Sequence, residues 1–274
     1  MVLLSLFYVS LQSECIIDMK KLILIIAALG LISCTQDDDS RFTDRELALI
    51  REASDGMTEG TAVPPGTMRV LTIEDSLDLT VLRGISRDIS ADALLSEEFA
   101  MLSRLMVATV THPTQDGVGI AAPQIGLNRR VVAVQRFDKE GEPFEVYPNI
   151  RIVCLSDSVA YGPEGCLSVP DMRADVLRSQ EVVIEYTDMK RLKEIASGSS
   201  PRKLRKRLER EYASGRSSGG EVGRVAGWRA GGEAGWKSGG APLPTVRDTI
   251  SGFTAVIFQH ETDHLDGILY IDRL

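Results

Sequence analysis

Hydrophobic and polar residues follow different periods in different parts of this chain. Between residues 94 and 110 apolar side chains recur near helical spacing, and Ser90 or Asp92 stands where a helix N-cap is expected, so this segment predicts a helix. Four other runs are rich in β-branched residues or alternate between apolar and polar, which predicts strands: 130–135, 144–147, 149–155 and 180–188. The first two of these runs flank a turn and predict a hairpin. The chain therefore alternates between helical and strand periods.

A second predicted helix begins near the end of the chain. Residues 253–258 are apolar on nearly every side, as expected for a buried helix, and they lead directly into the sequence QHETDH at 259–264. Asp248 or Thr249 is placed to cap this helix, and Gly267 suits its end. The polar motif is thus expected to lie on a helix inside the core.

This motif has the H-E-x-x-H pattern of metallohydrolases. Residues four apart share one face of a helix, so His260 and His264 can bind one metal ion, and Glu261 can reach a water on that ion as a general base. The alternative is a structural helix that carries two histidines. Val256 and Ile257 share the face of His260, which predicts an apolar pocket beside the metal.

A metal site of this kind needs a third ligand. Cys166, in the loop-like segment 163–170, is the best candidate, because thiolate binds zinc and ferrous iron strongly; a buried inert thiol and a Cys-His nucleophile are the alternatives. The glycine-rich segment 117–126 lets backbone approach a ligand closely, and Gln124 supplies a hydrogen-bond donor there. Without a ligand, this segment would be a tight turn into a strand.

Composition and charge narrow the class of protein. The 274 residues are 43% hydrophobic and 26% charged, as in globular proteins, and a net charge of −8 gives no reason to expect a specific nucleic-acid partner. The four cysteines are irregularly spaced and predict no disulfide framework. Between Lys190 and Gly240 the balance reverses, with 13 Lys and Arg against 5 Glu.

The first 34 residues predict an export signal. Lys20 and Lys21 precede the apolar run 22–30, and the following Leu-Ile-Ser-Cys resembles the lipobox of bacterial lipoproteins, in which Cys34 would be lipidated and would anchor the protein to a membrane. A buried apolar strand or helix is the alternative interpretation. Met19 fits the start of such a signal better than Met1 does.

The remaining chain divides into a linker and a domain. Residues 35–67 predict a tether and linker with one helix-like run at 43–53, and residues 68–274 predict the catalytic domain. Within that domain, 190–244 is a low-complexity insertion for which disorder is expected, apart from a short basic helix at 201–212. A solvated loop is favoured there over contact with anionic lipid or RNA.

Three segments, taken in order, resemble the signature motifs of peptide deformylases: GVGIAAPQ at 117–124, EGCLS at 164–168 and QHETDH at 259–264. Enzymes of this family remove the formyl group from the initiator methionine of bacterial proteins. The resemblance extends from about residue 80 to the last residue, interrupted by the insertion. It implies an α+β fold in which antiparallel β-sheets pack around a central metal-binding helix.

The resemblance also implies a metal centre. It places one divalent ion on Cys166, His260 and His264, with water as the fourth ligand. Ferrous iron is the usual ion in the family, and zinc or nickel substitutes for it. The catalytic carboxylate of the family falls on Glu261.

The remaining implied roles concern the substrate, a formyl-methionyl peptide or nascent chain. The oxyanion donors of the family fall on the Gln124 side-chain amide and the Leu167 backbone N–H. Val256 and Ile257 would hold the methionine side chain, and backbone at Val118 and Gly119 would pair with the extended peptide.

Two other functions stay open at this point. An exported H-E-x-x-H zinc peptidase shares the helix motif, and a membrane-anchored peptide-binding protein without turnover would keep the same fold. The leader predicts a bacterial membrane-anchored lipoprotein, whereas the family resemblance predicts the cytoplasm. The two indications of location disagree.

Overall fold

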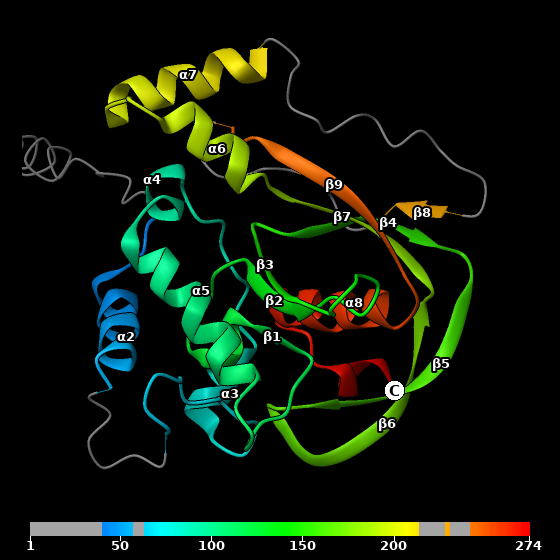
Figure 1. Cartoon of the computed structure of the whole chain (residues 1–274). Helices are drawn as coiled ribbons and strands as arrows, with labels where there is room; N and C mark the ends of the chain where they lie inside the picture. Colours follow the sequence, from blue (N-terminus) through cyan, green and yellow to red (C-terminus); the bar gives the residue numbers. More distant parts are fainter. Residues whose placement is uncertain (1–39, 57–62, 214–227, 231–241) are drawn as a thin grey trace, which may run out of the picture. The chain divides into compact units, whose positions relative to one another are not determined.

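A computed structural model describes residues 40–56, 63–213, 228–230 and 242–274, which belong to a compact unit spanning residues 39–274 (Figure 1). The predicted leader, Cys34 and much of the predicted insertion lie outside the described residues. No helix within the described ranges is long and apolar enough to cross a membrane.

Helices and strands alternate along this unit. The helices are α2 (Asp44–Ser54), α3 (Ser76–Leu82), α4 (Ala91–Leu94), α5 (Glu97–Val110), α6 (Met189–Ala196), α7 (Pro201–Ala213) and α8 (Gly252–Leu265), with 3-10 turns η1 (Ala122–Ile125) and η2 (Tyr270–Arg273). The strands are β1 (Gly119–Ala121), β2 (Val131–Gln135), β3 (Phe144–Pro148), β4 (Arg151–Ser156), β5 (Val159–Cys166), β6 (Val169–Ser179), β7 (Glu181–Thr187), β8 (Trp228–Ala230) and β9 (Thr245–Ser251).

The strands that the structure describes form three antiparallel sheets, with the orders β1-β2-β3, β8-β4-β7-β9 and β5-β6. Helix α8 lies between the first two of them (Figure 1). Its Phe258 shares one apolar cluster with Val132 of β2 and Ile184 of β7, and all three side chains are fully buried. The predicted α+β fold with a central helix is confirmed.

In a second apolar cluster, helices pack against the β1-β2-β3 sheet. Leu102 and Met106 of α5 lie against Ile120 and Val131 there. α2 begins with a capping box between Thr43 and Glu46, and its buried Ile50 joins the same cluster. The helix-like run predicted within the linker therefore packs on the domain.

The sequence prediction was wrong about where the first long helix begins. Ser90 caps only the four-residue helix α4, and a second N-cap, Ser96, begins α5 through a hydrogen bond to the Phe99 N–H. Because a serine side chain can accept from the backbone two or three positions ahead, it interrupts one helix and starts the next.

A larger error concerns residues 245–251. They form strand β9, although a helix was predicted to begin at the cap Asp248 or Thr249. The alternating β-branched sequence pairs along the whole of β7, from Thr187 opposite Thr245 to Glu181 opposite Ser251. Ser251 is the actual N-cap position of α8, and neither Asp248 nor Thr249 caps it. Gly252, with φ of +64°, makes the bend between strand and helix.

Two further segments are more ordered than predicted. The supposed loop at 163–170 forms the closed end of the β5-β6 ribbon. The start of the predicted insertion folds into α6 and α7, because buried Leu192 and Ile195 of α6 and Leu204 and Leu208 of α7 join the α5 cluster. The basic helix predicted at 201–212 is present; α6 was missed.

Candidate metal centre and active site

Helix α8 and the end of the β5-β6 ribbon bring three metal-binding side chains together. One donor atom each from Cys166, His260 and His264 lies within 4.8 Å of the other two, and Cys166 Sγ is 3.2 Å from His264 Nε2. The two histidines are one helical turn apart on α8, as the spacing predicted. A thiolate and two imidazoles are a donor set that suits zinc or ferrous iron.

Local irregularity in the ribbon aims Cys166 at the helix. The pairing register shifts between Gly165 and Cys166, so that Cys166 pairs with Val169 and Leu167 falls in the turn between them. The Ser168 N–H lies 3.4 Å from Cys166 Sγ. A bulge at this point re-aims a side chain that a regular strand would direct elsewhere.

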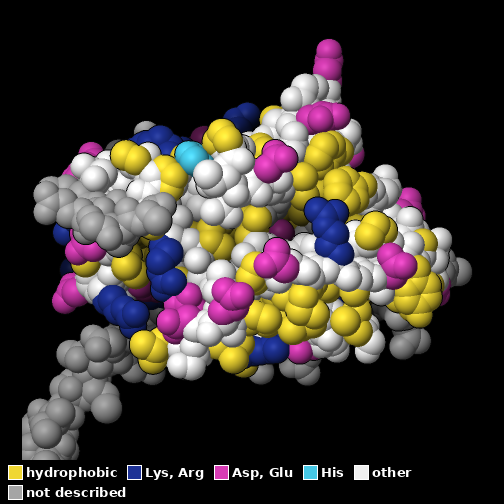
Figure 2. All heavy atoms as spheres, turned by 90° about the horizontal axis from the view of Figure 1, so that it is seen from below, with side chains coloured by type: hydrophobic (Ala, Val, Ile, Leu, Met, Phe, Trp, Pro, Cys, Tyr) yellow, Lys and Arg dark blue, Asp and Glu magenta, His cyan; other side chains and the backbone are white. Residues whose placement is uncertain are grey.

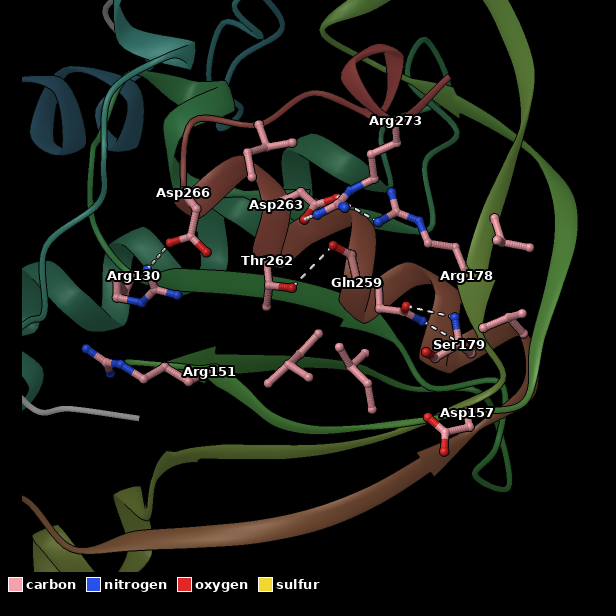
Figure 3. Close-up of a pocket in the computed structure, with 15 residues that line it drawn as sticks. Arg130, Arg151, Asp157, Arg178, Ser179, Gln259, Thr262, Asp263, Asp266 and Arg273 are labelled. Atoms are coloured by element: carbon pink, nitrogen blue, oxygen red, sulfur yellow. Dashed lines mark hydrogen bonds and ion pairs between the residues drawn. The ribbon is translucent and has the colours of Figure 1, made fainter. Parts of the chain in front are cut away.

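A buried network of charged side chains contacts the Nδ1 side of His260. Its Nδ1 lies 2.8 Å from Glu164 Oε2, and Arg178 donates to Glu164 at 2.7 Å and to Asp263 at 2.6 Å. Figure 3 shows Arg178 and Arg273 converging on Asp263 of α8. A carboxylate at Nδ1 fixes the proton there and leaves Nε2 free to bind a metal.

The same network sets the protonation of these side chains. Burial alone would raise the pKa of Glu164, but hydrogen bonds from His260 and Arg178 lower that pKa to about 2. Burial, reinforced by the neighbouring His260, lowers the pKa of His264 well below its ordinary value, which keeps that imidazole neutral. A neutral imidazole is the form that binds a metal.

Glu261 faces the cavity beside the metal-binding group and is almost completely buried. Burial raises the pKa of its carboxyl to about 7, against the opposing effect of His260. Its Oε2 has no hydrogen-bond partner among the described residues. A carboxyl with a pKa near neutrality and a free oxygen suits proton transfer at neutral pH.

A cavity of about 780 Å³ opens onto these residues. Its polar wall includes Gln124, whose side-chain oxygen accepts from the Ala121 N–H at 2.8 Å, so that its amide nitrogen faces Cys166 Sγ at 3.6 Å and Ser168 Oγ at 3.3 Å. The predicted site residues that line the cavity are Val118, Gly119, Gln124, Cys166, Leu167, Val256, Ile257, His260 and Glu261. His264 closes the metal-binding group from within the core.

The sequence of this chain is also similar to that of a known protein family. The family model described as polypeptide deformylase matches residues 68–199 and 244–274, which is more than half of the chain. The chain belongs to the polypeptide deformylase family. Deformylases hydrolyse the N-formyl group of formyl-methionyl peptides and use a divalent metal ion, and this chain is an enzyme of that kind.

Individual peptide deformylases are similar to this chain in sequence and in structure. The chain is 28% identical over 201 residues to a peptide deformylase of Leptospira biflexa, covering 71% of this chain and 82% of the relative. It is 31% identical over 196 residues to peptide deformylase 2 of Gloeobacter violaceus, covering 71% and 74%. A Met-Ala-Ser-bound class I type b peptide deformylase from Acinetobacter baumannii superposes with a TM-score of 0.50 at 26% identity, covering 76% and 98%.

The structure also shows what the sequence interpretation did not assign. Glu164 was noticed only as part of a motif, and Arg178 and Asp263 were given no role, although together they orient His260. Half-exposed Met172 and Phe253 stand at the cavity mouth. His112 follows α5, and its Nδ1 lies 2.9 Å from Thr114 Oγ1.

Gly119 is packed against the carboxylate of Glu261. A Cβ at this position would lie 2.5 Å from Glu261 Oε1 and 2.8 Å from Ile257 Cγ2. Gly119→Ala must therefore displace Glu261, and a shift of about 1 Å in a reacting group can cost about 100-fold. We expect kcat/KM for formate release to fall by roughly 10- to 100-fold while bound metal is unchanged.

The matched control for this variant is Gly162→Ala on β5, where an added Cβ meets nothing within 4 Å. Both variants carry the same change within a strand, so the loss of intrinsic chain flexibility is comparable. Equal activity of the two variants would show that Gly119 imposes no constraint on Glu261.

Proposed function

We propose that Cys166, His260 and His264 hold one divalent ion, ferrous iron in the native protein, with zinc or nickel able to replace it. The donor set supports this, because one thiolate and two imidazoles leave an open position for substrate and water. When bound, the ion lowers the pKa of a coordinated water and polarises the formyl oxygen.

Glu261 performs the proton transfers in this proposal. Its carboxylate accepts a proton from the attacking water and later passes that proton to the leaving amine, which releases formate and a free N-terminal methionine. The buried carboxylate, with a pKa raised to about 7 by burial, can exist in both protonation states near neutral pH. One group can thus serve as base and then as acid.

Gln124 and Leu167 stabilise the charge that develops on the formyl oxygen. The Gln124 amide is held by the Ala121 N–H, so its donor faces the Cys166 sulfur without reorganisation. The Leu167 backbone N–H lies in the turn directly after Cys166. Each such donor is worth about 2.7–4 kcal/mol in comparable sites.

The substrate is bound as an extended peptide with its methionine in the apolar part of the cavity. Val256 and Ile257 form the apolar wall. Among the described strands β1 pairs with β2 alone, so the stretch from Val118 through Gly119 offers an edge for strand addition. The related Acinetobacter baumannii structure contains Met-Ala-Ser, which supports a peptide ligand here.

The observation that carries this proposal is the convergence of Cys166, His260, His264 and Glu261 on one cavity. Its test is an anaerobic preparation assayed for bound metal, for formate released from formyl-Met-Ala-Ser, and for cleavage of casein. We expect one iron per chain, formate release and intact casein. Casein cleavage without formate release would favour the zinc peptidase, and metal binding without either reaction would favour a binding protein.

Lipid anchoring through Cys34 stays a prediction, because Cys34 lies outside the described residues. It is supported by the lysines, the apolar run and the Leu-Ile-Ser-Cys sequence that precede the tether. The intact mass of the protein extracted from native membranes distinguishes a lipidated chain beginning at Cys34 from an unprocessed one.

A further inference from the structure

Helices α6 and α7 form a basic helical hairpin on an acidic protein. Between Met189 and Ala213 there are nine Lys and Arg and three Glu, whereas the remainder of the chain has 22 Lys and Arg against 36 Asp and Glu. The two helices pack against each other and project beside the β7-β9 end of the large sheet (Figure 1). No described residue of this hairpin lines the cavity.

The basic side chains of α7 form one continuous outward stripe. Leu204 and Leu208 are buried in the domain core, which fixes the rotation of the helix. With a period of 3.6 residues, the side of the helix opposite these leucines presents four exposed basic residues: Arg202, Lys203, Lys206 and Arg210. Arg207 lies at the edge of this side and donates to the Ser197 carbonyl. The acidic Glu209 lies on the same outward side, where it pairs with the exposed Arg205.

The face seen in Figure 2, on the side of the domain away from α7, has a different charge pattern. Lys and Arg side chains are interspersed there with Asp and Glu and with hydrophobic patches. An anionic surface would therefore find a mixed charge on this face and a concentrated positive charge on the hairpin. Long-range electrostatics would turn the α7 stripe toward such a surface.

The sequence ahead of the domain indicates which anionic surface is near. Ser40, the first described residue, accepts a hydrogen bond from the Ser90 N–H at the start of α4, and Leu94 of α4 shares the apolar cluster of Leu204 and Leu208. Five residues lie between the predicted lipid-bearing Cys34 and Ser40, so the six steps along the chain reach at most about 20 Å. A lipid anchor at Cys34 would keep the domain within that distance of a bilayer.

We propose that the outward stripe of α7 binds the headgroups of anionic phospholipids and orients the domain on the membrane surface. A lipid chain and a polybasic patch are the two signals that together give stable membrane attachment. Each basic residue near an anionic bilayer contributes roughly a fivefold gain in binding. RNA is the other polyanion that could bind a basic helix, and the leader gives it no support.

The test uses the full chain and vesicles of phosphatidylcholine with or without about one third phosphatidylglycerol, a content that gives a negative surface. The measured quantity is the ratio of the two partition coefficients, in which the apolar contribution of the leader cancels. Lys203→Glu combined with Lys206→Glu is expected to lower this ratio at least about 30-fold. Added salt should abolish the preference of the wild type.

The matched control is Arg45→Glu with Arg104→Glu, two exposed basic residues on α2 and α5 with the same change in net charge. It should leave the ratio nearly unchanged. Equal effects of the two double variants, or no effect of either, would overturn the proposal, as would loss of binding to a single-stranded RNA with unchanged vesicle binding. Formate release verifies folding, and Lys203→Gln with Lys206→Gln replaces the glutamates if the first variant is inactive.

Discussion

Glu261→Gln is expected to lower kcat/KM for formate release from formyl-Met peptides by about 10²- to 10⁴-fold, because an amide cannot accept and return the proton. Glutamine has nearly the same shape, so the packing of Glu261 against Gly119 and Ile257 is kept. The carboxylate is only 4% exposed, which limits its replacement by bulk solvent. Bound metal should stay at the wild-type level, because Glu261 is outside the Cys166, His260 and His264 group.

The control for this variant is Asp266→Asn at the end of the same helix. It makes the same carboxylate-to-amide change at a half-exposed residue that pairs with Arg130 at 2.6 Å and does not line the cavity. Because Asp266 lies outside the cavity and outside the metal-binding group, activity should stay close to that of the wild type. A wild-type rate in Glu261→Gln would remove this residue from the mechanism.

The parts of this protein that the sequence predicted best depend on local chemistry. The His260 and His264 spacing places two ligands on one helical face wherever that helix lies, and the structure has them on one face. The strand predicted at 130–135 is β2, because its β-branched residues fill both apolar clusters on either side of the sheet. Such features require no knowledge of distant partners.

The parts that it missed depend on pairing across long separations. Residues 245–251 contain plausible caps for a helix, but they form a strand because their backbone pairs with the edge of β7. Likewise, the position of Cys166 results from the bulge in the β5-β6 ribbon. The orientation of His260 results from Glu164 and Arg178, which are 96 and 82 positions away in the chain. No local period encodes these contacts.

The two cysteines that the structure describes provide a sharp test of the metal centre. Cys166→Ala removes the thiolate and leaves two imidazoles, so metal affinity should fall more than about 100-fold, since changes to the hydrogen-bond partners of ligands already cost about 10- to 100-fold. Formate release should disappear with the metal. Metal content after dialysis against a chelator and the rate of formate release are the measurements.

Cys154→Ala is the matched control, because Cys154 is also a free thiol but is buried in β4 and outside the metal-binding group. It should keep its metal and its activity, and lower the free energy of unfolding by about 1 kcal/mol through the small cavity it leaves. Both variants replace a thiol by a hydrogen atom, one in the metal-binding group and one in the core. Comparing them therefore separates the loss of a metal ligand from the loss of packing. Full metal content in Cys166→Ala would falsify the proposed ligand set, whatever its effect on stability.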